Sequence, residues 1–240
     1  MTDAPRARRL GAFLLPLLSL VACDQKDPNA TGKAGSGDFY PLVDGASWRY
    51  EHKNLDGETW TEEVTLEAVD FEGEPAFLLA DSPGPSGSNS ESVLQKDGDA
   101  ILRVHKEVLF DGSVSEAVDY DPGFIRFDAA WLEFEEGQEQ SYGYERTQLD
   151  GNGVAMPTEM REHRYTLVNS DAVVEVPAGD FSGCLEIRRK RVRESGDIPG
   201  AGDDKTFWFC DGIGKVKEYE AATGKNEELL DCDVPGGACP

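Results

Sequence analysis

The feature that most constrains the fold of this 240-residue chain is a series of short β-prone runs separated by acidic-glycine pairs. Such pairs favour tight hairpin turns, and strands joined by short turns are antiparallel neighbours. The pairs are Asp56-Gly57, Glu72-Gly73, Asp97-Gly98 and Asp111-Gly112. A two-residue turn at the third pair places Leu94 opposite Ile101. The sequence therefore predicts a mainly β protein built from an antiparallel sheet, in which only Phe124–Phe134 has the composition of a short helix.

The N-terminal segment is typical of a secretory signal peptide. Three arginines precede an apolar run, Leu10–Ala22, that ends in small residues. The run is shorter than the roughly 20 apolar residues that a membrane-spanning helix needs. Its basic flank and small-residue end match a cleaved signal instead. We therefore assign residues 1–22 to a signal peptide, with cleavage between Ala22 and Cys23.

The residues at the cleavage site, Leu20–Cys23 (Leu-Val-Ala-Cys), resemble the lipobox of bacterial lipoproteins. The resemblance implies a diacylglycerol thioether on Cys23 and acylation of the new amino group. Two or three chains hold a protein stably, because each buried CH2 contributes about 0.8 kcal/mol. Asp24 resembles an inner-membrane retention signal that is not general among bacteria. The implied location is therefore the outer membrane or the periplasmic face of the inner membrane. The alternative is an ordinary cleaved signal with an incidental cysteine.

A polar segment separates the signal from the rest of the chain. Residues 24–38 contain glycine and proline and show no apolar periodicity. Together with Cys23 they form a tether, residues 23–38, with a reach on the order of 20 Å. Residues 39–240 then form the β domain. They contain no second apolar stretch of membrane-spanning length.

A faint internal repeat suggests a division of this domain. Gly45–Tyr50 has the pattern Gly-x-x-Trp-x-Tyr, and Gly137–Tyr142 has Gly-x-x-Gln-x-Tyr. If the repeat is structural, the domain consists of two similar β half-domains with a boundary near residues 121–135. Chance is the other explanation for so few matching residues.

Cysteine usage agrees with export. Besides Cys23 there are four cysteines, and an even number in an exported chain indicates two disulfides with three possible connectivities. They are Cys184, Cys210, Cys232 and Cys239. None forms the C-x-x-C pair typical of a zinc site.

A hairpin register selects one connectivity. If Phe181–Arg193 and Lys205–Cys210 pair around the glycine-rich segment between them, Cys184 lies opposite Cys210. Opposed residues have Cβ atoms about 4.5–5.5 Å apart, close to what a disulfide needs. The register predicts a Cys184–Cys210 disulfide, which leaves Cys232 and Cys239 to form the second one. The alternative is an unpaired core cysteine at Cys184.

The charge of the chain excludes one class of partner. It has 23 Lys and Arg against 47 Asp and Glu, a net charge of −24. Because nucleic acid and anionic lipid carry the same sign, we expect neither as a surface partner. A solvated surface explains the acidity more simply than an acidic binding site.

The basic run Arg188–Arg193 stands out against the acidic composition of the chain. Alternation along a strand divides it between two faces, where neighbouring acids neutralise it or where it contacts an acidic partner.

A search for catalytic and cofactor motifs finds none. His52, His105 and His163 lie in strand-like runs without a Gly-x-Ser-x-Gly elbow, and we expect all three to be exposed. Asp150–Gly153 resembles the start of a calcium loop but lacks the later ligands, which favours a turn. No phosphate loop, dinucleotide motif or metalloprotease motif is present. We therefore expect no enzyme activity, no cofactor and no metal site.

Three motifs resemble a loose group of bacterial envelope proteins built as incomplete β-barrels. They are Pro-Leu-x-x-Gly-x-x-Trp-x-Tyr at Pro41–Tyr50, Val-Pro-Ala-Gly-x-Phe at Val176–Phe181 and Gly-Ile-Gly-x-Val at Gly212–Val216. The group is similar in shape to the half-barrel carriers LolA and LolB, which hold acyl chains in an apolar concavity. The resemblance implies a fold more than a function.

Two functions are consistent with these observations. The first is a membrane-anchored, exported lipoprotein without catalytic activity, acting as a binding or structural module of the cell envelope through a protein partner. The second is a carrier of lipid or of a small apolar ligand in a half-barrel concavity. A ligand retained on the protein would favour the carrier.

Overall fold

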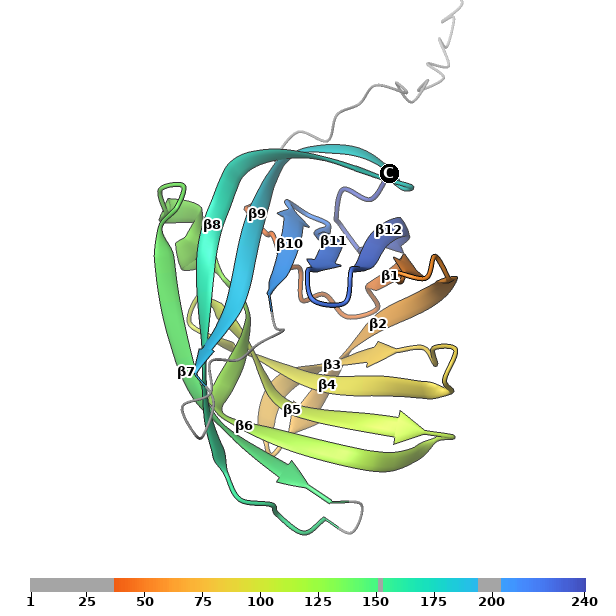
Figure 1. Cartoon of the computed structure of the whole chain (residues 1–240), viewed down its shortest axis with the longest axis vertical. Helices are drawn as coiled ribbons and strands as arrows, with labels where there is room; N and C mark the ends of the chain where they lie inside the picture. The colour runs from red at the N-terminus through yellow and green to blue at the C-terminus, as the bar shows by residue number, and fades with distance from the viewer. Residues whose placement is uncertain (1–36, 151–152, 194–203) are drawn as a thin grey trace, which may run out of the picture. The chain divides into compact units, whose positions relative to one another are not determined.

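The computed structural model describes residues 37–150, 153–193 and 204–240, all of which belong to one compact unit. Within these ranges, strands β1 to β12 form a closed antiparallel barrel in which consecutive strands pair (Figure 1). The strands are β1 (Ser47–Lys53), β2 (Thr59–Phe71), β3 (Glu74–Asp81), β4 (Ser88–Asp97), β5 (Ala100–Phe110), β6 (Ser113–Asp128), β7 (Glu139–Leu149), β8 (Glu159–Val176), β9 (Gly179–Arg193), β10 (Lys205–Cys210), β11 (Gly214–Glu220) and β12 (Lys225–Asp233).

The predicted antiparallel β fold is confirmed, and the barrel is closed rather than incomplete. Closure occurs because β1 pairs along its length with β2 on one side and with β12 on the other. The expected boundary near residues 121–135 falls at the end of β6 and in a short 3-10 helix, η1 (Ala129–Glu133), inside this single sheet. The helix begins where the Asp128 carboxylate accepts a hydrogen bond from the backbone N–H of Ala130.

The hairpin at Asp97-Gly98 has a different register from the predicted one. Asp97 pairs with Ala100, so the turn lies at Gly98-Asp99 and Leu94 is opposite Arg103; a β-bulge follows between Leu94 and Val93, which pairs with His105. A bulge adds one residue to one strand and changes which side chains face inward. Arg103, paired with the buried Leu94, lines the interior of the barrel.

Two of the sequence motifs contact each other at one end of the barrel. The indole Nε1 of Trp48 donates to the carbonyl of Ile213 at 2.7 Å, and the Tyr50 hydroxyl donates to the carbonyl of Lys215 at 2.8 Å. Gly214 between them has φ of +96°, and a Cβ there would lie 3.3 Å from Pro41. The glycine thus lets the bend approach the first strand closely.

Both predicted disulfides are present. Residue pairs of β9 and β10 follow the expected register, with Ile187 opposite Phe207, and Cys184 is bonded to Cys210. The second disulfide joins Cys232 to Cys239. The described chain starts beside them, because the N–H of Gly212 donates to the carbonyl of Asp38 at 2.8 Å.

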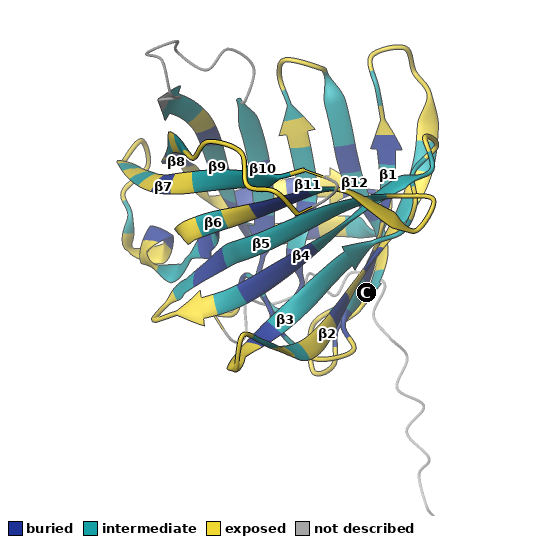
Figure 2. Ribbon diagram, turned by 90° about the horizontal axis from the view of Figure 1, so that it is seen from below, coloured by how far each residue is buried: buried dark blue, intermediate teal, exposed yellow. Residues whose placement is uncertain are grey.

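The same end is closed by the long β8–β9 hairpin, which bends across it (Figure 1). Near its tip the N–H of Ala178 donates to the carbonyl of Leu229 at 2.9 Å, and Val174 and Val176 join the core. Buried and exposed positions alternate along much of the sheet (Figure 2). Within the described ranges, no helix is long and apolar enough to cross a membrane.

Apolar side chains fill the barrel next to this closed end. Phe127 contacts Trp131 and Phe209 at centroid distances of 5.3 Å, and Trp131 stacks on Tyr165 at 5.0 Å. Toward the opposite end, near the β1–β2 and β11–β12 turns, the inward positions become polar. His52, Glu227 and Lys225 are examples. The barrel thus has an apolar core at the disulfide end and a polar interior at the other.

Candidate functional site

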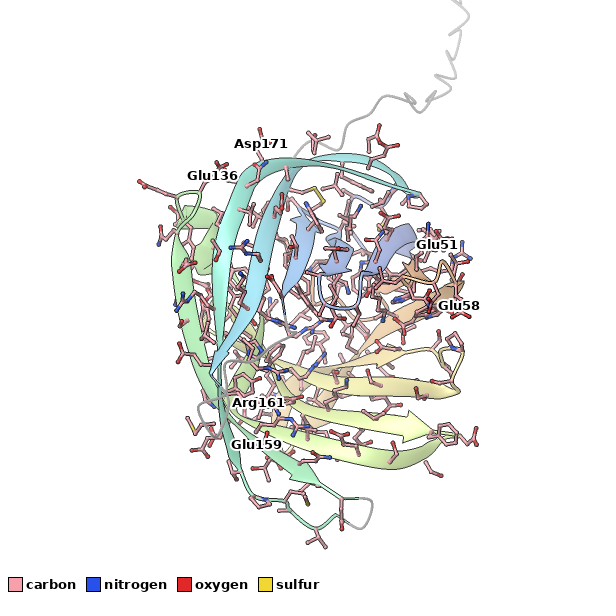
Figure 3. All side chains as sticks on the ribbon, in the orientation of Figure 1. Glu51, Glu58, Glu136, Glu159, Arg161 and Asp171 are labelled. Carbon is pink, nitrogen blue, oxygen red and sulfur yellow. A yellow bond between two sulfur atoms is a disulfide. The ribbon has the colours of Figure 1, made fainter. Side chains whose placement is uncertain are left out.

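A cavity of about 330 Å³ occupies the polar part of the barrel interior. Its aromatic and apolar lining includes Tyr40, Trp48, Tyr50, Phe124 and Phe207. Its charged lining comprises Arg103, Lys106, Arg126, Arg189, Lys205, Lys215, Lys225, Glu62, Asp81, Glu218 and Glu227. Cations therefore outnumber anions in the lining, although the whole chain carries −24. The acidic excess is on the outside, where Glu58, Glu136 and Asp171 are exposed (Figure 3).

One wall of the cavity, formed by β10, β11 and β12, is a network of ion pairs. The Lys215 ammonium lies 2.5 Å from Glu227 and 3.1 Å from Glu218, and Lys205 lies 2.6 Å from Glu218. Burial disfavours the charged forms, but the partners outweigh it. The carboxylates raise the pKa of Lys215 well above its usual range, and the two lysines hold the pKa of Glu218 well below its own.

His52, Glu62 and Glu227 form a second group on β1, β2 and β12. His52 Nε2 lies 2.9 Å from Glu62, and Trp60 stacks on the imidazole at 5.0 Å. One ligand atom from each member of the group lies within 4.8 Å of the others, which is the donor set of a His-carboxylate metal site. Lys215, however, already holds one oxygen of Glu227 and would repel a cation there. We therefore interpret the group as a hydrogen-bonded wall of the cavity.

The facing wall carries three cations, Arg103 and Lys106 on β5 and Arg126 on β6, which we call the cationic face. Burial, followed by repulsion from Arg103 and Arg126, lowers the pKa of Lys106 to about 8. Burial and the nearby Arg126 also lower the pKa of Arg103. Burial lowers the pKa of Arg126, but the nearby Tyr40, followed by Glu218, outweighs burial and raises it. The three side chains thus concentrate positive charge on one side of the cavity.

A smaller cavity of about 140 Å³ adjoins the first, with Arg103 lining both. The arginines that line only the smaller cavity include Arg146, which lies 2.9 Å from Glu116, and Arg161, which lies 2.7 Å from Glu159 (Figure 3). These two positive charges are therefore neutralised locally.

The expectation that all three histidines are exposed was wrong. His52 and His163 are 1% and 2% exposed, and His105 is partly buried with Nδ1 2.6 Å from Asp119. His52 lines the cavity of about 330 Å³ and His163 lines the smaller one, whereas His105 lines neither. Ser90 also lines the cavity, but its hydroxyl donates to Asp81 at 2.5 Å. His52 and His105 are hydrogen-bonded to the carboxylates of Glu62 and Asp119, respectively.

Other predicted residues have different outcomes. The basic run is divided between faces as expected: Arg189 packs between the rings of Phe124 and Phe207, whereas Lys190 lies 3.3 Å from Asp204. Ala22 and Cys23 lie outside the described residues. So does part of Asp150–Gly153, where the Asp150 carboxylate accepts a hydrogen bond from the N–H of Val154, as in a turn.

Sequence reasoning missed the cationic face. Arg103 and Arg126 are isolated basic residues next to apolar ones, as in Ile101-Leu102-Arg103 and Phe124-Ile125-Arg126-Phe127, whereas Lys106 is followed by Glu107. An alternating strand usually carries such a charge on its solvent side. Only the three-dimensional arrangement places these charges together.

No protein-family model and no curated protein sequence matches the chain. Among solved structures, the chain is similar to a protein from Parabacteroides distasonis described as a candidate lipoprotein. The TM-score is 0.43 and the sequence identity is 11%, over 81% of this chain and 98% of that chain.

Proposed function

We propose that this protein is a lipid-anchored binding protein of the bacterial envelope, without enzymatic activity, whose barrel holds a small polar molecule. The observation that carries the proposal is the cavity of about 330 Å³ with its charged and aromatic lining. This volume lies within the range of small-molecule sites, about 300–1,000 Å³. A barrel with a purely structural role would be expected to fill this space with side chains, as it does at the disulfide end.

The lining argues against the carrier of an apolar ligand that the sequence also suggested. An acyl chain in this cavity would remove water from Arg103, Lys106 and Arg126 without replacing the lost hydrogen bonds. Burying charged groups in this way is strongly unfavourable. A polar ligand that pairs with these groups avoids the cost.

Anchorage rests on the lipobox resemblance at Leu20–Cys23. We expect a palmitate analogue to label the full-length protein and a Cys23→Ser variant to take up no label. Cys239→Ser is the control, because a disulfide cysteine should not affect lipid attachment. Labelling that survives in the Cys23→Ser variant would refute the anchor.

Native mass spectrometry of the full-length protein extracted from envelopes tests whether the cavity holds a small molecule. We expect a small-molecule adduct on the wild type and none on Ser90→Phe, which places a large ring in the cavity lining. Ser113→Phe, at an exposed end of β6, should keep the adduct, and thermal denaturation should show that both variants are folded. A bare wild-type barrel, or an adduct that persists on folded Ser90→Phe, would contradict the proposal.

A further inference from the structure

Every carboxylate that lines the cavity of about 330 Å³ has a partner other than the cationic face. Glu218 and Glu227 hold lysines, Glu62 holds His52 and Asp81 accepts from Ser90. Among residues 37–240, apart from the two gaps, no Asp or Glu oxygen lies within 4.0 Å of a side-chain nitrogen of Arg103, Lys106 or Arg126. The positive charge of this face is therefore not neutralised by a contacting carboxylate of the described chain.

This arrangement is unfavourable by itself. The Nε atoms of Arg103 and Arg126 are buried and have no hydrogen-bond partner. Repulsion adds to the cost, because Arg126 disfavours the charged form of Arg103 and both disfavour that of Lys106. Buried polar groups in native proteins nearly always have partners, supplied by protein, water or a ligand. An anion in the cavity would accept hydrogen bonds from the two guanidinium groups. It would also balance the positive charge of the cationic face.

The geometry points to the chemistry of that anion. Two guanidinium groups favour a group with several oxygens, because each presents a planar fork of N–H donors, and the ammonium adds a point charge. A phosphate monoester offers three oxygens and a charge of about −1.5 to −2 at pH 7. The ring of Phe124 lies beside Arg103, and Phe207 also lines the cavity, so both rings provide apolar surface for the rest of the molecule.

We propose that the ligand of the barrel is a small molecule with a phosphate monoester, held by Arg103, Lys106 and Arg126. This inference rests on the proposed function and names its ligand class. A lipid headgroup and a soluble phosphate ester share this chemistry. The cavity of about 330 Å³ favours the soluble ester, because two acyl chains have no room beside it.

The test is calorimetric titration of the full-length protein with glycerol 3-phosphate, and with glycerol as the uncharged comparison. We expect saturable binding of the phosphate ester only. Arg103→Gln and Arg126→Gln should each weaken it at least tenfold, as expected for the loss of a charged hydrogen-bond donor. Arg49→Gln is the matched control, because Arg49 lies on β1 and pairs with Asp231 away from the cavity. It should bind like the wild type.

Several outcomes separate the possibilities. Equal affinity in folded Arg103→Gln and Arg126→Gln, or equal affinity for glycerol, would overturn the inference. So would an absence of binding to both glycerol 3-phosphate and monomeric dihexanoyl phosphatidic acid. If the native adduct persists in that case, the proposed function stands while the inference fails. Binding of the phosphatidic acid alone, lost in Arg103→Gln, would support the cationic face and identify the source as a lipid headgroup.

The affinity should also fall as the pH rises from 7.5 to 9.5, because Lys106, with a pKa of about 8, loses its proton over this interval. The phosphate keeps its charge in this range, since its second pKa is about 6. The charged groups that act on Lys106 are Arg103 on its own strand, Arg126 and Glu116 on β6, and Asp81 on β3. A Lys106→Gln variant should bind more weakly at pH 7.5 and show little change up to pH 9.5. The same pH dependence in this variant would exclude Lys106 as its cause.

Discussion

Replacing Lys215 by methionine is expected to lower the free energy of unfolding by about 3–5 kcal/mol at pH 7. Glu218 and Glu227 lie opposite each other on β11 and β12, and both contact the Lys215 ammonium. Removal of that ammonium leaves Glu227 without its closest cation inside the barrel. Urea denaturation at pH 7 measures the effect.

The loss should depend on pH in a defined direction. Because the folded-state pKa of Glu218 is depressed, its stabilising contribution is present above the unfolded-state pKa and is lost as the pH falls through the folded-state pKa. In Lys215→Met, Glu218 loses one of the cations that depress its pKa and therefore takes up a proton at higher pH than in the wild type. The difference between the two proteins should therefore shrink as the pH is lowered from 7 toward 4.

Two variants control this experiment. Lys217→Met removes an ion pair with Glu228 outside the cavity lining and is expected to cost at most about 1 kcal/mol. Lys215→Met/Glu227→Gln should recover part of the stability, since one uncompensated charge is gone. A deficit of the same size at pH 4 and pH 7 would show that lost packing, not lost charge pairing, causes the destabilisation.

Replacing Cys184 and Cys210 together by alanine is expected to lower the free energy of unfolding by about 3–4 kcal/mol. The disulfide closes a loop with a sequence separation of 26, so its loss enlarges the unfolded ensemble. Both cysteines are also buried in the core, at 0% and 3% exposure, which adds a packing loss. Guanidinium denaturation of the double variant gives the value.

The second disulfide is the internal comparison. Cys232 and Cys239 are separated by only 7 residues, and the same loop argument gives about 2 kcal/mol for their replacement by alanine. The order of the two double variants is the sharper test, because both are measured against one wild type. A larger loss in Cys232→Ala/Cys239→Ala would contradict the loop-entropy explanation.

Features encoded within a hairpin could be predicted from the sequence. The pairing of Cys184 with Cys210 followed from the symmetry of one hairpin about its loop, and the structure has that register. The hairpin at Asp97-Gly98 shows the limit of the same method. Its turn lies one residue further along, at Gly98-Asp99, so Leu94 is opposite Arg103 instead of Ile101.

The sequence by itself determined the antiparallel β fold, the order of neighbouring strands and the disulfide pairing, because turn residues and strand composition are local signals. Only the tertiary structure decided that the barrel closes, since β1 and β12 pair across most of the chain. It alone also decided that Arg103, Lys106 and Arg126 line one cavity. The physical reason is the period of two along a strand: each bulge exchanges inward and outward positions, and bulges interrupt the pairing of β4 with β5 and of β5 with β6.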